Sequence, residues 1–150
     1  MRYLGLETIP LTRLDTSGYD VISLAGGQFK LANGHEAFVE TLAKDFPREK
    51  DNLHNYFSLI EQIAGASSLH SLLRHAESDA VLNTEYQMRS IDDVIGTLIN
   101  DPLLCKVLVG NLPLYAAERG KTPFSTHAFI TDFYNQSAFR IAGGSDIITK

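Results

Sequence analysis

Cysteine and clustered positive charge are what this sequence has least of. Its 150 residues include one cysteine, Cys105, and the formal net charge is -5. A single cysteine excludes a disulfide within the chain and is typical of a reducing compartment. The lysines and arginines are scattered along the sequence. Without a basic patch to neutralise phosphates, a nucleic-acid partner is not expected.

Long apolar segments are also lacking. No apolar run approaches the roughly 20 residues that a helix needs to cross a bilayer, and the N-terminus has no signal-peptide core. We therefore expect a cytoplasmic chain.

Familiar catalytic and metal-binding patterns are absent too. The sequence has no Gly-x-Ser-x-Gly segment, so Ser125 and His127 do not suggest a serine hydrolase. No His-x-x-x-His pattern joins the five histidines, so each is expected to face solvent or cap a helix, and no metal site is predicted. Cys105 lies among apolar residues and is expected to be a small buried hydrophobe, not an activated thiol.

What the sequence does contain is the composition of a folded protein. Hydrophobic residues make up 44% and charged residues 21%, as in ordinary globular chains. A length of 150 residues suits one domain, which we take to span the whole chain.

The first third of the chain predicts β-structure. A strand is expected near residues 12–14. Residues 19–24 and 28–31 are two further β-rich segments, separated by Gly26-Gly27. A strand, a glycine turn and a second strand predict a β-hairpin.

Helical periodicity takes over after Gly34. Apolar stripes at three- and four-residue spacing predict about five helices, within residues 35–46, 47–64 with an extension over 69–76, 90–99, 101–112 and 122–134. Ser90 with Asp93 resembles a capping box, and Asp101 with Pro102 is a second N-cap signal. In the last helix Phe129, Ile130, Phe133 and Tyr134 are expected to form the packing face. The predicted fold class is α+β: a small antiparallel sheet or hairpin followed by about five helices.

The C-terminal segment suggests a larger protein. A short strand is predicted at residues 139–141, followed by a Gly143-Gly144-Ser145 turn that begins another helix. The chain stops a few residues later. We therefore expect a piece of a longer polypeptide.

Landmarks along most of the chain occur in a familiar order. They are Arg13-Leu14-Asp15, Gly18-Tyr19-Asp20-Val21, Gly34-His35-Glu36-Ala37-Phe38 leading to Leu42, Phe46-Pro47-Arg48-Glu49, Ser90-Ile91-Asp92-Asp93-Val94-Ile95, Asp101-Pro102-Leu103-Leu104-Cys105-Lys106-Val107-Leu108, the segment from Pro123 to Tyr134, and Ala138-Phe139-Arg140-Ile141-Ala142-Gly143-Gly144-Ser145. In this order the sequence resembles the middle portion of the phytoene dehydrogenase-related FAD-dependent oxidoreductases, which include phytoene desaturases, carotenoid isomerases and retinol saturases. Members of the group usually carry proline directly before the Gly-Gly pair, where this chain has Ala142.

The resemblance implies a function. The chain would be the substrate-binding domain of a flavoprotein that acts on carbon–carbon bonds of an isoprenoid or polyene, with FAD-binding segments before and after it. Gly143, Gly144 and Ser145 would approach the FAD. An apolar substrate tunnel would be lined by Tyr56, Phe57, Phe124, Phe129, Phe133 and Phe139. An apolar substrate would also favour peripheral membrane contact, and the fragment alone is expected to be inactive.

Two alternatives stay open at this point. One is a non-catalytic helical module that binds another protein, and the other is a lipid carrier without a cofactor. An apolar stripe that faces a substrate tunnel looks the same in sequence as one that faces a core. The sequence also lacks a Gly-x-Gly-x-x-Gly segment, so the chain is not expected to hold a dinucleotide by itself.

Overall fold

The computed structural model describes residues 8–66, 80–144, 146 and 147. Within them the chain forms six α-helices, two short 3₁₀ helices and two separate two-stranded antiparallel sheets, which confirms the predicted α+β class. In chain order the elements are β1 (Leu11–Arg13), β2 (Asp20–Leu24), β3 (Gly27–Leu31), α1 (His35–Ala43), η2 (Pro47–Glu49), α2 (Lys50–Gly65), α4 (Ala80–Gln87), α5 (Ile91–Leu98), α6 (Pro102–Leu108), η3 (Leu112–Tyr115), α7 (Phe124–Gln136) and β4 (Phe139–Ile141). The helical extension predicted at residues 69–76 lies outside the described residues.

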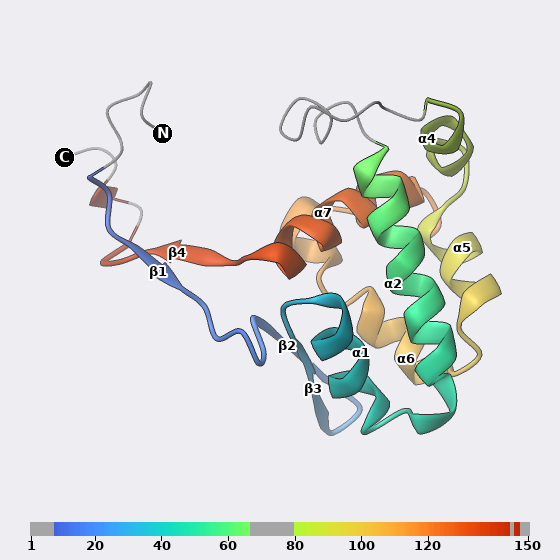
Figure 1. The fold of residues 1–150 in the computed structure, drawn as a ribbon, viewed down its shortest axis with the longest axis horizontal. Helices are drawn as coiled ribbons and strands as arrows, with labels where there is room; N and C mark the ends of the chain where they lie inside the picture. The colour runs from blue at the N-terminus through green and yellow to red at the C-terminus, as the bar shows by residue number, and fades with distance from the viewer. Residues whose placement is uncertain (1–7, 67–79, 145, 148–150) are drawn as a thin grey trace.

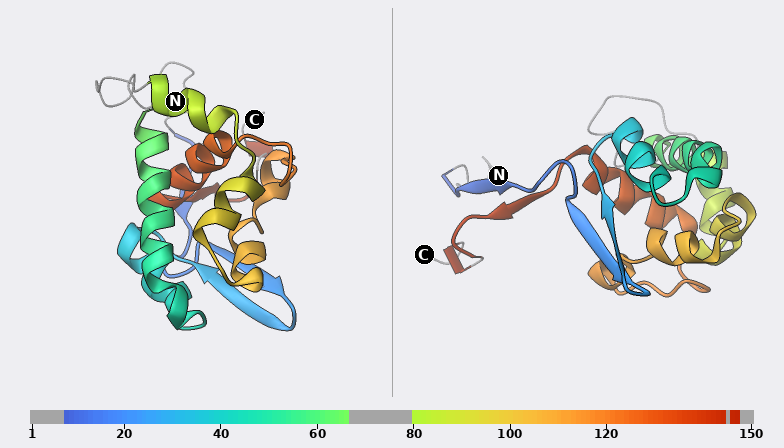
Figure 2. Two further views of the ribbon diagram at one scale, coloured as in Figure 1. Left: turned by 90° about the vertical axis from the view of Figure 1, so that its right-hand side faces the viewer. Right: turned by 90° about the horizontal axis from the view of Figure 1, so that it is seen from below.

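The helices gather into one body, as Figure 1 shows, and the β2–β3 hairpin lies against it. Strands β1 and β4 come from opposite ends of the chain and pair with each other, with Arg13 opposite Phe139 and Leu11 opposite Ile141. Together they form a narrow ribbon that extends away from the helical body, most clearly in the right-hand view of Figure 2. No helix in the described part of the chain is long and apolar enough to span a bilayer.

The predicted hairpin is confirmed, with its turn one residue earlier than expected. Strands β2 and β3 pair from Asp20 opposite Leu31 to Leu24 opposite Gly27. The two turn residues are Ala25 and Gly26, with φ angles of 52° and 78°. Tight two-residue hairpin turns of this kind need positive φ at both central residues, which matches the right-handed twist of the strands. Gly27 therefore belongs to β3, and Ala25 takes a left-handed conformation.

Both predicted N-caps are present. The Ser90 hydroxyl accepts the Asp93 N–H at 3.2 Å, and the Asp93 carboxylate accepts the Ser90 N–H at 3.3 Å, which completes the capping box of α5. The Asp101 carboxylate accepts the N–H groups of Leu103 and Leu104 at the start of α6. These side chains satisfy backbone donors that have no partner within the helix.

A buried carboxylate joins two helical layers. Glu49, 6% exposed, ends η2 immediately before α2. Its carboxylate accepts the backbone N–H groups of Asn100 and Asp101 at 3.2 and 2.9 Å, and the side-chain amide of Asn52 at 2.7 Å. The start of α2 is thereby fixed to the turn between α5 and α6.

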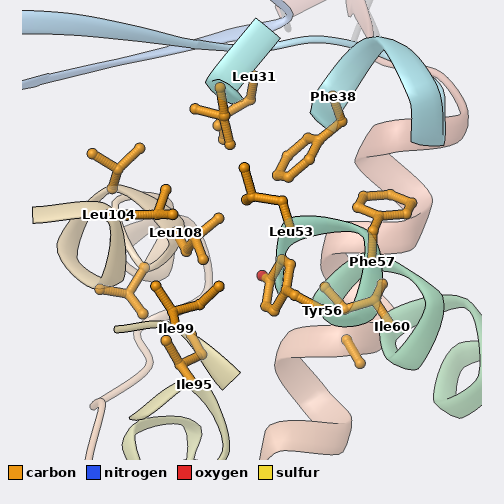
Figure 3. Close-up of a cluster of buried hydrophobic side chains, with 14 of the residues drawn as sticks. Leu31, Phe38, Leu53, Tyr56, Phe57, Ile60, Ile95, Ile99, Leu104 and Leu108 are labelled. Carbon is orange, nitrogen blue, oxygen red and sulfur yellow. The ribbon is translucent and has the colours of Figure 1, made fainter. Parts of the chain in front are cut away.

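Helix α2 is the centre of the hydrophobic core. Its Leu53, Tyr56, Phe57 and Ile60 are fully buried, and α1 and α7 pack along it. Figure 3 shows these side chains pointing toward residues from the hairpin, α1, α5 and α6. The predicted packing stripes of α1 and α2 are therefore confirmed.

The packing face predicted for α7 is wrong. The side of α7 that is buried carries Phe124, His127, Ala128, Thr131, Asp132 and Asn135. Phe129, Ile130 and Phe133 are only half-buried, and Tyr134 is exposed. After Phe124, helix α7 thus packs through small and polar residues, and the side that carries Phe129, Phe133 and Tyr134 lies at the border of the core and beyond it.

Candidate functional site

The candidate site lies where the ribbon leaves the helical body. A pocket of about 430 Å³ opens there between β1, the turn before α1, and the ends of α2 and α7. Its lining is polar and carries both signs of charge: Arg13, Asn33, Gly34, His35, Glu61, Asp132, Asn135 and Gln136. We call it the polar pocket.

Two asparagines build the floor of the polar pocket. The side-chain amide of Asn33 donates to the carbonyl oxygens of Tyr134 and Asn135 at 2.7 and 2.9 Å. Asn135 returns the contact, since its Oδ1 accepts the Gly34 N–H and its Nδ2 donates to the Ala32 carbonyl, both at 2.9 Å. Gly34 has a φ of 92°, a conformation that glycine takes most easily. The end of the hairpin is thus clamped to the last turn of α7.

A second hollow with an aromatic wall adjoins the polar pocket. It has a volume of about 360 Å³ and lies along the end of α7 and the start of β4. Its lining is Phe133, Tyr134, Gln136, Ser137, Ala138 and Phe139, and Gln136 lines both hollows. We call it the aromatic hollow. Side by side, the two offer a polar end and an apolar wall to one molecule.

The ribbon continues this apolar wall. Residues directly opposite each other in an antiparallel pair share one face, so Leu11, Arg13, Phe139 and Ile141 lie on the same face of the ribbon. Leu11 is 45% and Phe139 52% exposed. An isolated two-stranded ribbon is marginally stable in water. This face therefore carries apolar surface that the described residues do not cover.

The structure distributes the six aromatic residues predicted to bind substrate over three places. Tyr56, Phe57 and Phe124 have no exposed surface and belong to the core, where the rings of Tyr56 and Phe124 meet edge to face at 6.4 Å. Phe129 and Phe133 contact each other on α7, with ring centroids 4.6 Å apart. Phe139 lies on β4, and of the six only Phe133 and Phe139 line the same hollow. A substrate contact for any of them stays a prediction.

The predicted glycine turn lies farther out along the ribbon. Gly143 and Gly144 follow β4 and have φ angles of 87° and 102°, so both positions favour glycine for conformational reasons. The Ala142 N–H donates to the Pro10 carbonyl at 2.9 Å, which keeps this turn beside the segment that leads into β1. Ser145 lies outside the described residues, and the approach of this turn to FAD stays a prediction.

His127 is a buried polar residue that the sequence did not predict. We expected His127 to face solvent or cap a helix, but it is fully buried on α7. Its Nε2 lies 2.8 Å from the Tyr56 hydroxyl and its Nδ1 lies 2.9 Å from the Tyr115 hydroxyl. Burial lowers the pKa of His127 to about 4, so the ring is neutral at pH 7. A neutral ring has one N–H and one lone pair, so one tyrosine accepts a hydrogen bond and the other donates one.

Cys105, the one cysteine of the chain, has the features of an unreactive thiol. Cys105 is half-buried on α6 and its thiol donates to the Ile99 carbonyl at 3.7 Å. Burial raises the pKa of this thiol, which disfavours the reactive thiolate.

Comparison with known proteins gives a distant similarity. The chain is 27% identical over 149 residues to an all-trans-retinol 13,14-reductase of Rattus norvegicus, an alignment covering 88% of this chain and 24% of that protein. It is 23% identical over 160 residues to the enzyme of the same name from Macaca fascicularis, covering 95% of this chain and 26% of that protein. No family model and no solved structure matches the chain.

The chain thus spans about a quarter of the length of these relatives. Both are retinol saturases, members of the phytoene dehydrogenase-related group that the sequence resembles.

Proposed function

We propose that the chain is the substrate-binding part of an FAD-dependent oxidoreductase that acts on a carbon–carbon double bond of a polyene alcohol. The observation that carries this proposal is the aromatic hollow beside the polar pocket. A polyene alcohol has a long apolar body and one hydroxyl. The aromatic wall suits the body, and the amides and charged groups of the polar pocket suit the hydroxyl.

The outward side of α7 supports this assignment. A helix that packs only for stability buries its aromatic residues and exposes its polar ones. Helix α7 does the reverse at its C-terminal end, where Asp132 and Asn135 are buried while Tyr134 is 37% exposed. Both buried side chains are hydrogen-bonded, Asn135 to Gly34 and Ala32 and Asp132 to Gln136, so their burial is compatible with the fold. What supports a binding role is the outward position of the aromatic residues at this end of α7.

The cofactor would be held largely by other segments of the same polypeptide. The chain has no Gly-x-Gly-x-x-Gly segment to hold the pyrophosphate of FAD. The part of this chain that fits a flavin is the exposed Gly143-Gly144 turn, where an added Cβ at Gly143 would meet no atom within 4 Å, so a planar ring can approach the backbone. When bound, the flavin supplies hydride transfer; the residues of this chain hold the substrate and exclude water.

The exposed apolar face of the ribbon would allow contact with a membrane, from which such a substrate would be taken up. Polyene alcohols partition into membranes, so we include peripheral contact with a lipid surface in the proposal. Leu11 and Phe139 are the residues of this face that would reach it.

A binding titration tests the proposal. All-trans-retinol is added to the chain and its fluorescence is followed as it leaves water. We expect saturable binding that weakens by about tenfold in F133A and in F139A, because each removes an aromatic side chain from the hollow. The matched control is L114A, which removes an apolar side chain that is 60% exposed on η3.

Two results of this titration would contradict the proposal. If F133A and F139A bind retinol as tightly as the unaltered chain, the aromatic hollow is not the site. If L114A weakens binding equally, retinol associates with exposed apolar surface in general, and the proposal fails as well.

A further inference from the structure

Two histidines from different helices meet beside the polar pocket. His35 is the first residue of α1, and His54 lies in the second turn of α2. The Nε2 atom of His35 lies 3.4 Å from the Nδ1 atom of His54, and their ring centroids are 5.4 Å apart. Sequence spacing gave no sign of this pair, because 19 residues and a change of helix separate its members.

The separation of the two nitrogens suits a shared metal ion. It is longer than the 2.7–3.2 Å that is typical of a hydrogen bond. Two imidazoles on one tetrahedral Zn²⁺, each about 2.0–2.1 Å from the metal, place their nitrogens about 3.3–3.4 Å apart. The same geometry sets the ring centres about 5.2 Å apart, close to the 5.4 Å observed.

A carboxylate orients the first of these rings. The Nδ1 atom of His35 lies 3.1 Å from Glu61 Oε2, which fixes the ring proton on Nδ1 and leaves the Nε2 lone pair directed at His54. A metal-binding histidine usually donates its second N–H to a carboxylate in this way. The ring of His35 also packs on Phe57, with centroids 4.9 Å apart, which restricts its rotation.

A third ligand is within reach. Glu36 Oε1 lies 4.0 Å from His54 Nδ1, and the Glu36 side chain is 79% exposed, so core packing does not oppose a change of its rotamer. In the described parts of the chain no set of three histidine, cysteine or acidic side chains already surrounds a metal position. The site thus consists of two preformed nitrogens and one carboxylate that would move by a rotamer change.

We propose that His35, His54 and Glu36 bind a divalent transition metal, with Zn²⁺ as the expected ion and Glu61 as the residue that positions His35. Two imidazoles and a carboxylate with one remaining position for water are an established zinc ligand set. The inference does not depend on the proposed polyene substrate.

Calorimetric titration of the full 150-residue chain with Zn²⁺ tests the site. We expect one ion per chain, and an affinity at least tenfold weaker in H35Q and in H54Q, since each removes one of the two preformed ligands. E36Q should weaken binding several-fold. E61Q should weaken it by about tenfold, as is usual when the carboxylate behind a metal-binding histidine is lost.

Two control variants assign the binding. Glu118 pairs with Lys121 and makes no contact with the proposed ligands, so E118Q should leave the affinity unchanged. The double variant H70Q/H75Q removes two histidines outside the described residues and should also leave it unchanged. Saturable binding absent up to about 1 mM Zn²⁺, or weakened by H70Q/H75Q and not by H35Q or H54Q, overturns the proposal.

A second measurement uses the unaltered chain and does not depend on how the variants fold. In ¹⁵N spectra of the histidine rings, Zn²⁺ should shift Nε2 of His35 and Nδ1 of His54 as the coordinated atoms. Shifts confined to other histidines, or coordination through the opposite ring nitrogens, contradict the geometry.

Discussion

His127 is the residue whose chemistry depends most on the fold. It lies on the buried side of α7 between the hydroxyls of Tyr56 and Tyr115, and burial lowers its pKa from 6.5 to about 4. The neutral ring gives a hydrogen-bond partner to the buried Tyr56 hydroxyl and to the partly buried Tyr115 hydroxyl. Protonation would place an unpaired charge among the core aromatic rings.

This pKa makes stability depend on pH in one window. In the unfolded chain His127 takes up a proton as the pH falls below 6.5, whereas in the folded chain it takes up that proton only near pH 4. Stability is therefore retained above pH 6.5 and falls as the pH drops toward 4, by about 1.4 kcal/mol per pH unit. Urea unfolding at several pH values measures this slope.

The variant H127Q should flatten that slope, since glutamine does not titrate. Exposed carboxylates contribute equally to both proteins and cancel in the comparison. An unchanged slope in H127Q between pH 6.5 and 4 would mean that another group carries the effect.

At position 110 the close approach of Ile22 leaves room for glycine but not for a residue with a Cβ atom. An added Cβ would lie 2.7 Å from two atoms of Ile22, whose side chain reaches from the hairpin to the end of α6. We expect G110A to lower the free energy of unfolding by about 1–3 kcal/mol through overpacking. The matched control is G96A in α5, where a Cβ meets nothing within 4 Å. It should raise stability by about 0.5–1 kcal/mol, because alanine favours helix. Equal effects of the two substitutions in thermal unfolding would refute the contact.

At the scale of elements, local signals predicted the structure well. The Ser90–Asp93 capping box, the Asp101–Pro102 start and the hairpin are each encoded within a few residues, and each is confirmed. Local signals did not predict the buried face of α7. Its aromatic residues form a regular stripe, but the partners of His127 and Asn135 come from distant segments, so the sequence alone could not show which side faces inward.

The same limit applies to the candidate site. The polar pocket depends on Asn33 and Asn135, which are 102 residues apart and join only in the fold. The strand at residues 139–141 was predicted, but its pairing with β1 was not. Tyr56 and Phe139 were both predicted to bind substrate. The sequence pattern did not show that Tyr56 is fully buried while Phe139 is half-exposed.

The clamp at the end of α7 gives a prediction at this scale. N135A removes the side-chain contacts to Gly34 and Ala32 and leaves the buried Ala32 carbonyl without this donor, while the Gly34 N–H keeps its 3.2 Å bond to the backbone carbonyl of residue 135. We expect a loss of about 1–3 kcal/mol in the free energy of unfolding. The matched control is N100A, because Asn100 is exposed and is hydrogen-bonded through its backbone N–H; it should change the free energy of unfolding by less than about 0.5 kcal/mol. Comparable losses for both variants in urea unfolding would show that the clamp adds nothing specific.

At the scale of the whole molecule, a helical body with one core carries a projecting two-stranded ribbon. The aromatic hollow and the polar pocket lie at the junction of the two, where the end of α7 passes into β4. The proposed polyene-binding role is drawn from this junction, the exposed apolar face of the ribbon and the distant similarity to two retinol reductases.

The most direct test of that role is to map bound all-trans-retinol on the ¹H–¹⁵N spectrum of the full chain. The account predicts that amide shifts concentrate at the end of α7 and along β4, around Phe133, Tyr134 and Phe139, and extend to Asn33 and Gly34 in the polar pocket. Shifts that avoid this junction, or that appear only near exposed residues elsewhere such as Leu114, would contradict it.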